Sequence, residues 1–315
     1  MAKVLVTGGS GFIGTHLCRQ LTQEGHEVRV LDLVSAKTPV KGVQYEKGDV
    51  RIPKDLSRLV DGVDAVYHLA AMVSVPLCQE QPIESYETNL LATCRVLEAV
   101  KSESQKRGKR VRMVFAGSSV VYGNLTQEGE ARSETSQLAW PPSFYGAQKL
   151  GSEHTISLYH QNHGIPAVVF RFFNVFGPGQ DPKSPYSGVI SIFSTAIKER
   201  KPMKLNGGGA QTRDFVSVHD VARALRMALT LDESRCDANA INLGTGKSIT
   251  IRGLAEEMSL AANQELLIEN TPPRSGDVVH SRADIGRANE ILNWSPQVDL
   301  RTGLAELLHA ERSQG

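Results

Sequence analysis

Apolar and often β-branched residues form short runs along the first half of the chain, and amphipathic stretches separate these runs. The first run is residues 3–8 (KVLVTG), and the pattern recurs at residues 27–33, 64–71, 111–118 and 166–174. Runs of this length between turn residues predict buried strands. The intervening segments, such as GTHLCRQLTQEGH and NLLATCRVLEAVKSES, place apolar residues at helical spacing. Strand and helix alternate for about 170 residues, which predicts an α/β fold with a doubly wound parallel sheet.

The regular alternation stops after Asn174, where the Gly- and Pro-rich segment FGPGQDPKSPYSG begins. Further on, RDFVSVHDVARALRMAL and AINLGTG return to the α/β pattern. We therefore expect two domains, with the chain crossing between them more than once. The first takes residues 1–172 and a returning segment of roughly residues 213–245, while a second, smaller α/β C-terminal domain takes residues 173–212 and 246–315.

The segment VLVTGGSGFIGTHL places three glycines directly after the first predicted strand and at the start of a helix. Gly8, Gly11 and Gly14 are these glycines, and Phe12 and Ile13 lie between the last two. Glycine permits a tight turn and a close approach of the backbone to a pyrophosphate, and the helix N-terminus offers N–H groups to the phosphates. The pattern predicts the dinucleotide-binding turn of a Rossmann domain.

An acidic residue ends the second predicted strand, as expected for such a domain. Asp32 lies 18 residues beyond Gly14, where a carboxylate can accept hydrogen bonds from the adenosine ribose hydroxyls. The same charge repels a 2′-phosphate, so the sequence favours NAD over NADP.

Composition narrows the choice of partners. The formal charge is +1, from 35 Lys and Arg against 34 Asp and Glu, so we expect neither nucleic acid nor a membrane as partner. The basic run at residues 102–112 has no interleaved aromatic rings and is interpreted as a solvated helix end and loop.

Four cysteines without CxxC spacing predict no zinc site and no disulfide framework. No apolar run approaches the ~20 residues that span a bilayer, and we expect a soluble cytoplasmic protein.

The glycine spacing Gly-x-x-Gly-x-x-Gly resembles the extended, nucleotide-sugar-modifying branch of the short-chain dehydrogenase/reductase family, and the likeness runs nearly end to end. The resemblance implies that Asp49 and Val50, in KGDVR, contact adenine and that Asn89 lies near the nicotinamide half. It also places four further residues along the cofactor, namely Leu69, Ala70, Ala71 and Phe172. From the residues alone, Asp49 could instead belong to a surface turn, and Asn89 could cap a helix.

In this family a Tyr-x-x-x-Lys pair works with a serine or threonine from the end of a preceding strand. SFYGAQKL provides Tyr145 and Lys149, and the resemblance selects Ser118 from FAGSSVVYG. A phenol with a pKa of about 10 is a poor base, but a lysine ammonium and an oxidised nicotinamide both favour the phenolate. Tyr145 would then take a hydroxyl proton as hydride leaves the same carbon for NAD. Ser118 would hold that oxygen, and Lys149 would also bind the nicotinamide ribose.

A tyrosine and a lysine four residues apart are ordinary neighbours on a helix. The glycine loop, Asp32 and Ser118 together favour the catalytic interpretation of the pair.

The residues after Ser118 help to separate the reactions of this family. Its dehydratases and decarboxylating enzymes commonly carry an acid within two positions, whereas this chain has Ser119 and Val120. Valine cannot exchange protons, which favours oxidation followed by re-reduction. That is the chemistry of the nucleotide-sugar 4-epimerases, in which a transient 4-keto sugar presents its other face and NAD stays bound. The resemblance is closest to UDP-glucose and UDP-N-acetylglucosamine 4-epimerases.

The C-terminal segments resemble the part of the family that binds a nucleoside diphosphate. FFNVFGPGQDP provides Asn174 as the sugar-diphosphate contact. Arg213 and Arg274 could hold the diphosphate by charge-assisted bonds, and Asp277 could accept a bond from a ribose hydroxyl. The alternative for each arginine is a surface ion pair.

Ser281 lies four residues beyond Asp277, where the resemblance places a gatekeeper. A tyrosine there restricts the site to plain hexoses, whereas a small residue leaves room for a 2-acetamido group. Ser281 therefore implies UDP-N-acetylglucosamine/N-acetylgalactosamine, together with UDP-glucose/galactose. The segment SVP also resembles acetamido-preferring epimerases, in which a serine such as Ser74 can lie close to the sugar.

Several alternatives remain open. A UDP-glucuronate 4-epimerase or decarboxylase would need a cation such as Lys183 for the C6 carboxylate. Another nucleotide-sugar dehydratase or reductase, a dehydrogenase that consumes NAD, and a non-catalytic NAD-binding sensor are further possibilities. The resemblance also implies a homodimer formed through the helices near residues 85–102 and 145–162.

Overall fold

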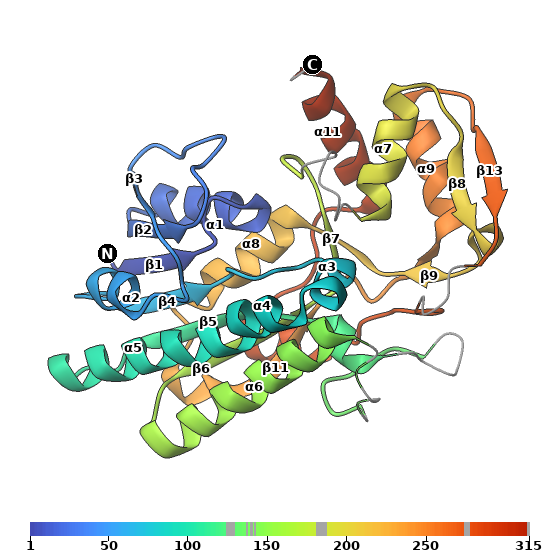
Figure 1. Cartoon of the computed structure of the whole chain (residues 1–315). Helices are drawn as coiled ribbons and strands as arrows, with labels where there is room; N and C mark the ends of the chain where they lie inside the picture. The colour runs from blue at the N-terminus through green and yellow to red at the C-terminus, as the bar shows by residue number, and fades with distance from the viewer. Residues whose placement is uncertain are drawn as a thin grey trace.

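Seven parallel strands form the central sheet (Figure 1). The computed structural model describes residues 1–123, 130–136, 138, 141, 143–180, 188–273 and 278–313. The strands are β1 (Lys3–Thr7), β2 (Glu27–Asp32), β3 (Val43–Lys47), β4 (Ala65–His68), β5 (Arg112–Ser118), β6 (Ala167–Phe172) and β11 (Asp237–Leu243). Their order is β11-β6-β5-β4-β1-β2-β3, so the direction of winding reverses between β1 and β4. The predicted doubly wound α/β sheet is confirmed.

Helices cover both faces of this sheet. The helices on one face are α2 (Pro53–Leu59), α5 (Ala92–Arg107) and α6 (Phe144–His163), and those on the other are α1 (Phe12–Gln23), α8 (Val218–Met227) and α10 (Gly286–Leu292). Each layer has its own apolar core against the strands. Because both faces are covered, β4 and β6 are buried along their whole length.

Two strands of the sheet escaped the sequence prediction. β3 lies at one edge and alternates partly buried with exposed residues, so it lacks an apolar run. β11 at the other edge carries a register shift between Asp237 and Ala240, which interrupts its pattern. The predicted strand 166–174 is divided, because β6 ends at Phe172 and β7 (Asn174–Phe176) pairs instead with β10 (Phe215–Ser217).

A second, smaller unit lies beside the carboxyl edge of the sheet (Figure 1). Its helices are α7 (Val189–Lys198), α9 (Ile251–Ala262) and α11 (Leu300–Ser313), and its strand pairs are β8 (Met203–Asn206) with β13 (Ile268–Thr271) and β9 (Thr212–Arg213) with β12 (Ile249–Thr250). A separate apolar core holds these helices together.

The domain boundaries given above stay a prediction. The return of the chain through α8 and β11 to the first unit supports them. α10 packs against the first unit as well, although it falls within the predicted second domain, and the adjoining Trp294 donates its indole N–H to the Asp220 carbonyl at 3.0 Å.

Short helices connect several of these elements. They are α3 (Val75–Glu80), α4 (Pro82–Tyr86), the π-helical turn η1 (Glu87–Leu91) and the 3₁₀ turns η2 (Ser119–Tyr122), η3 (Gly207–Gly209) and η4 (Glu233–Arg235). Among the described residues, no helix is both long and apolar enough to cross a membrane.

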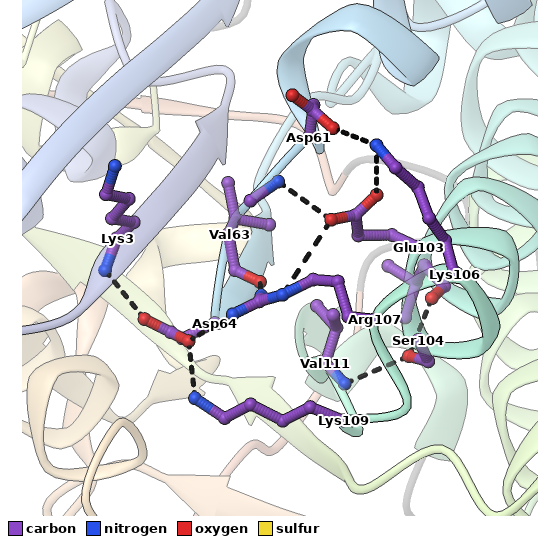
Figure 2. A network of polar contacts seen from close by, with 12 residues as sticks. Lys3, Asp61, Val63, Asp64, Glu103, Ser104, Lys106, Arg107, Lys109 and Val111 are labelled. Carbon is purple, nitrogen blue, oxygen red and sulfur yellow. Dashed lines mark hydrogen bonds and ion pairs between the residues drawn. The ribbon is translucent and has the colours of Figure 1, made fainter.

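The basic run at residues 102–112 forms the end of α5 and the loop after it, as predicted, and its last residue, Arg112, begins β5. Figure 2 shows its cations beside carboxylates: Lys109 Nζ lies 2.7 Å from Asp64 Oδ1, and Arg107 Nη2 lies 3.2 Å from the same oxygen. Lys106 pairs with Asp61. This run therefore has a structural explanation within the chain.

Candidate active site

A cavity of about 510 Å³ opens at the carboxyl ends of the central strands, where the winding of the sheet reverses. Ligands of doubly wound sheets bind at this position. Most of the predicted site residues line it, namely Gly8, Gly11, Phe12, Ile13, Gly14, Asp32, Asp49, Val50, Leu69, Ala70, Ala71, Ser118, Tyr145, Lys149 and Phe172. Residues scattered over more than half of the sequence thus meet in one cavity.

The glycine loop is shaped by close backbone contacts. Gly8 has a φ of +73°, and a Cβ on it would lie 2.7 Å from the Ala70 nitrogen. A Cβ on Gly14 would lie 2.4 Å from the Gly8 carbonyl oxygen. Glycine is therefore required at both positions. α1 begins directly after Gly11, which offers no capping side chain, and its first residues Phe12, Ile13 and Gly14 line the cavity.

Two predicted carboxylates, Asp32 and Asp49, line the cavity. Asp32 accepts hydrogen bonds from the N–H groups of Ser10 and Val34, at 3.0 and 3.2 Å, and this fixes it beside the glycine loop. Each of its oxygens keeps a further lone pair for a ligand. Asp49 pairs with Arg51, whose Nε lies 3.1 and 2.9 Å from its two oxygens.

Ser118, Tyr145 and Lys149 come together on one side of the cavity. Ser118 ends β5, accepts a hydrogen bond from the Val120 N–H at 3.3 Å and acts to lower the pKa of the Tyr145 phenol. Tyr145 lies in the first turn of α6, which the Ser143 hydroxyl caps. Lys149, one turn later, donates from Nζ to the Ala116 carbonyl at 2.7 Å and lies 5.8 Å from the Tyr145 ring centroid.

Burial dominates the protonation of this pair. It raises the pKa of Tyr145 to about 12, against the hydrogen bond from Ser118, which acts to lower it. Burial also lowers the pKa of Lys149 to about 8, against the charge of Glu153. The predicted lowering of the Tyr145 pKa depends on the Lys149 ammonium together with an oxidised nicotinamide, and it stays a prediction.

The side chains of Asn89 and Ser74 each bind the backbone of the chain. Asn89 lies within η1, so it neither opens nor caps a helix; its side chain binds the Met72 N–H at 2.8 Å and the Met72 carbonyl at 3.0 Å. Ser74 is 3% exposed and caps α3 by accepting a bond from the Leu77 N–H at 3.0 Å. Neither belongs to the described residues that line the cavity, and a ligand contact for them stays a prediction.

One predicted substrate residue, Asn174, lies next to the cavity. Asn174 begins β7 between Phe173 and Val175, which both line the cavity. Arg213 ends β9 and donates to the Thr212 carbonyl at 2.8 Å. The Thr212 N–H binds the Val279 carbonyl at 2.9 Å, which brings the segment with Ser281 alongside. Arg274, Asp277 and Lys183 lie outside the described residues.

Asp214 is a residue of this region that sequence reasoning missed. It is fully buried and accepts bonds from Thr245 N–H and Oγ1, both at 2.7 Å, and from the N–H groups of Gly246 and Ala283, both at 3.0 Å. Burial raises the pKa of its carboxyl group. Asp214, which directly follows Arg213, is thereby hydrogen-bonded to Ala283, two residues after Ser281. An acid beside the apolar stretch FVSV was the only signal in the sequence.

A doubly wound sheet, a glycine turn at its switch point and a Ser-Tyr-Lys group in the same cavity are features of enzymes that exchange hydride between a dinucleotide and an alcohol. The model of the NAD dependent epimerase/dehydratase family matches residues 4–244. The chain belongs to this family of enzymes, and its cofactor is NAD.

Relatives of known name cover nearly the whole chain. UDP-glucose 4-epimerase of Mycolicibacterium smegmatis is 33% identical over 99% of each chain. UDP-N-acetyl-alpha-D-glucosaminuronate decarboxylase of Bacillus cytotoxicus is 29% identical over 97% of this chain and 96% of its own. The solved structure of UDP-N-acetylglucosamine 4-epimerase from Methanobrevibacter ruminantium M1, in complex with UDP-N-acetylmuramic acid, has a TM-score of 0.90 at 32% identity and covers 100% of this chain and 99% of that one.

Proposed function

We propose that this protein catalyses the NAD-dependent 4-epimerisation of a UDP-sugar through a transient 4-keto sugar. The observation that carries the proposal is that Ser118, Tyr145 and Lys149 face the same cavity as the glycine loop. Dehydratases of the family that this chain resembles carry an acid at the position of Val120. Val120 instead packs against an apolar cluster and offers no proton. The epimerase names of the relatives support the same reaction.

In this mechanism Tyr145 is the base, and Ser118 holds the reacting oxygen. The Tyr145 phenolate takes the proton of the C4 hydroxyl and later returns it to the same oxygen, after the sugar has presented its other face. Because burial raises the pKa of Tyr145, its phenolate depends on positive charge nearby, and Lys149 provides part of it. NAD, when bound, provides a further positive charge in its oxidised ring and takes up and gives back the hydride of C4.

We assign the cofactor contacts to the residues that line the cavity, with Asp32 at the adenosine ribose, Asp49 and Val50 at adenine and Lys149 at the nicotinamide ribose. Asn89 would contribute by holding the backbone of Met72, one residue beyond the lining Ala71. A carboxylate at the position of Asp32 favours NAD over NADP.

For the nucleotide, we assign Asn174, Arg213 and Arg274 to the diphosphate and Asp277 to the uridine ribose. The support for Asn174 is its place between two lining residues. Arg213 is supported by the close approach of its strand to the segment that contains Ser281. Charge-assisted bonds from arginine suit a diphosphate.

The sugar is proposed to be N-acetylglucosamine/N-acetylgalactosamine, with glucose/galactose as a further pair, since Ser281 would leave room for the acetamido group near Ser74. The test uses a panel of UDP-, dTDP- and GDP-sugars without added cofactor, with products resolved by NMR. Ser281→Tyr should lose turnover of the N-acetylhexosamines by at least about tenfold and keep that of plain hexoses, while the small control Ser281→Ala should keep both. Unchanged N-acetylhexosamine turnover in Ser281→Tyr would contradict the gatekeeper role.

A UDP-glucuronate 4-epimerase or decarboxylase is the second candidate, because a decarboxylase is among the relatives that match nearly the whole chain. The same panel separates the candidates. Release of CO₂ from a UDP-uronate would favour decarboxylation, accumulation of NADH would favour a dehydrogenase, and binding of NAD with no product from any sugar would favour a sensor.

We also propose that the protein is a homodimer in a reducing compartment, the cytoplasm. α5 and α6 lie side by side on one face of the molecule (Figure 1). Exposed apolar side chains accompany them, including Ile83, Leu91 and Leu158. Grooves of about 680 and 430 Å³ run along this region. The four cysteines are free, which suits a reducing environment.

A further inference from the structure

Behind the Ser-Tyr-Lys group lies a buried ion pair that the proposed reaction does not use. Glu153 and Arg171 are each 6% exposed. Glu153 follows Lys149 by one turn of α6, on the same face of the helix. Arg171 belongs to β6, where it pairs with Gly117 of β5.

Arg171 holds the Glu153 carboxylate firmly. Its Nη2 donates to Glu153 Oε2 at 2.7 Å, and its Nε lies 3.2 and 3.1 Å from the two oxygens. The remaining Nη1 donates to the Tyr122 hydroxyl at 2.9 Å, which itself donates to Asn242 at 2.7 Å. A guanidinium bonded on two sides cannot turn away, so the carboxylate has a fixed position.

This carboxylate reaches the backbone directly beneath the proposed catalytic group. A Cβ on Gly117 would lie 3.0 Å from Glu153 Oε1 and 2.6 Å from the Phe170 carbonyl oxygen. Gly117 stands between Ala116, whose carbonyl accepts the bond from Lys149, and Ser118. The absence of a side chain at Gly117 is therefore what lets Glu153 approach this strand.

Few other charges act on Lys149. The titratable groups around it are Tyr145 and Glu153 on α6, Cys78 on α3, His68 on β4 and, through its pair with Glu153, Arg171 on β6. Burial raises the pKa of the Cys78 thiol and lowers that of His68 to about 3, so both are neutral near pH 7. The charge of Glu153 acts to raise the pKa of Lys149 against the effect of burial.

We propose that Glu153, clamped by Arg171, is a positioning residue that keeps Lys149 charged and directed at the strand that ends in Ser118. The use of the Lys149 charge in catalysis rests on the proposed function. Its physical basis is that a carboxylate one turn away stabilises the ammonium in a site where water cannot.

The test is an NMR titration of Lys149 in the full chain, labelled with ¹³C,¹⁵N-lysine and assigned by its loss in Lys149→Arg. In Glu153→Gln, which keeps the shape of the side chain, the pKa of Lys149 should fall by at least about 1 pH unit. An unchanged pKa would overturn the proposal. This readout needs no turnover, so a wild type that epimerises no UDP-sugar would contradict the proposed function and leave the titration decisive for Glu153.

The pH profile of kcat provides the readout in turnover. The limb at high pH reports loss of the Lys149 proton, so removing the anion should move that limb to lower pH, and kcat near pH 8 should fall several-fold. A residue that only supports the fold would lower kcat at every pH and leave the limb in place.

Two further variants separate this effect from unfolding. Glu153→Gln with Arg171→Met removes both buried charges; it should be more stable than Glu153→Gln alone and still show the lowered pKa of Lys149. The matched control is Glu103→Gln in the network of Figure 2, where a 5% exposed carboxylate accepts a bond from the Gly62 N–H at 2.8 Å. It should lose stability and leave Lys149 unchanged, and an equal fall in both single variants would overturn the proposal.

Discussion

At the level of single residues, the chemistry of Tyr145 depends on its distance from solvent and on two neighbours. Burial alone moves the pKa of its phenol in the wrong direction for a base. Ser118 opposes this only in part, so the phenolate form would depend on positive charge from Lys149 and from the bound cofactor. The residue would thus become a base only once NAD is bound, which suits an enzyme that must not abstract protons without a hydride acceptor.

Replacing Tyr145 by Phe removes the hydroxyl and leaves the ring in place. We expect kcat to fall at least about 100-fold, since general-base catalysis contributes that much or more, with an unchanged circular dichroism spectrum. Tyr159→Phe is the control, because Tyr159 lies on the same helix as Tyr145 and its hydroxyl binds Glu98 of α5 at an exposed position. This variant should keep the wild-type kcat. A loss of less than about tenfold in Tyr145→Phe would mean that another group takes the proton.

The sequence predicted single residues well where a motif constrained them. The glycines and Asp32 were found because only these residue types suit a dinucleotide turn, and all of them line the cavity. Asn89 and Ser74 were harder to place, since their side chains bind the backbone at Met72 and Leu77. Asp214 and Glu153 act through buried partners distant in sequence, and no local pattern indicates such contacts.

At the level of elements, the apolar runs predicted the central strands because parallel strands covered on both faces consist almost wholly of buried residues. The edge strands β3 and β11 were missed, since one is half exposed and the other is interrupted by a bulge. The same limit applies to exposed helix faces. Leu158 on α6 is 55% exposed and belongs to the proposed dimer face.

A charge on that face tests the proposed homodimer. Leu158→Glu should shift the mass measured by sedimentation velocity from dimer toward monomer, because an unpaired carboxylate would be buried in the interface. Ile192→Glu on α7 is a matched control, since Ile192 is also 55% exposed but belongs to the smaller unit, and it should stay dimeric. Leu158→Glu with wild-type mass, or a monomeric wild type, would count against the interface.

At the level of the whole molecule, the fold brings the predicted cofactor-binding residues and the predicted catalytic residues to the same cavity. The carboxyl ends of the central strands carry the glycine loop, Asp32 and Ser118, and in the smaller unit the strand of Arg213 lies beside the segment that contains Ser281. A sugar that is held through its nucleotide could rotate and present the other face of its ring while the nucleotide stays bound. In the proposed reaction, hydride therefore leaves C4 and returns to the opposite face within one site.

The most direct measurement uses UDP-glucose and UDP-N-acetylglucosamine that carry deuterium at C4, incubated with the purified protein without added cofactor. Products are examined by NMR and mass spectrometry. The proposed reaction predicts the C4 epimer of at least one of them, with deuterium retained at C4 and no NADH released to solution. An epimer that has lost its deuterium to water, or NADH released without an epimer, would contradict it.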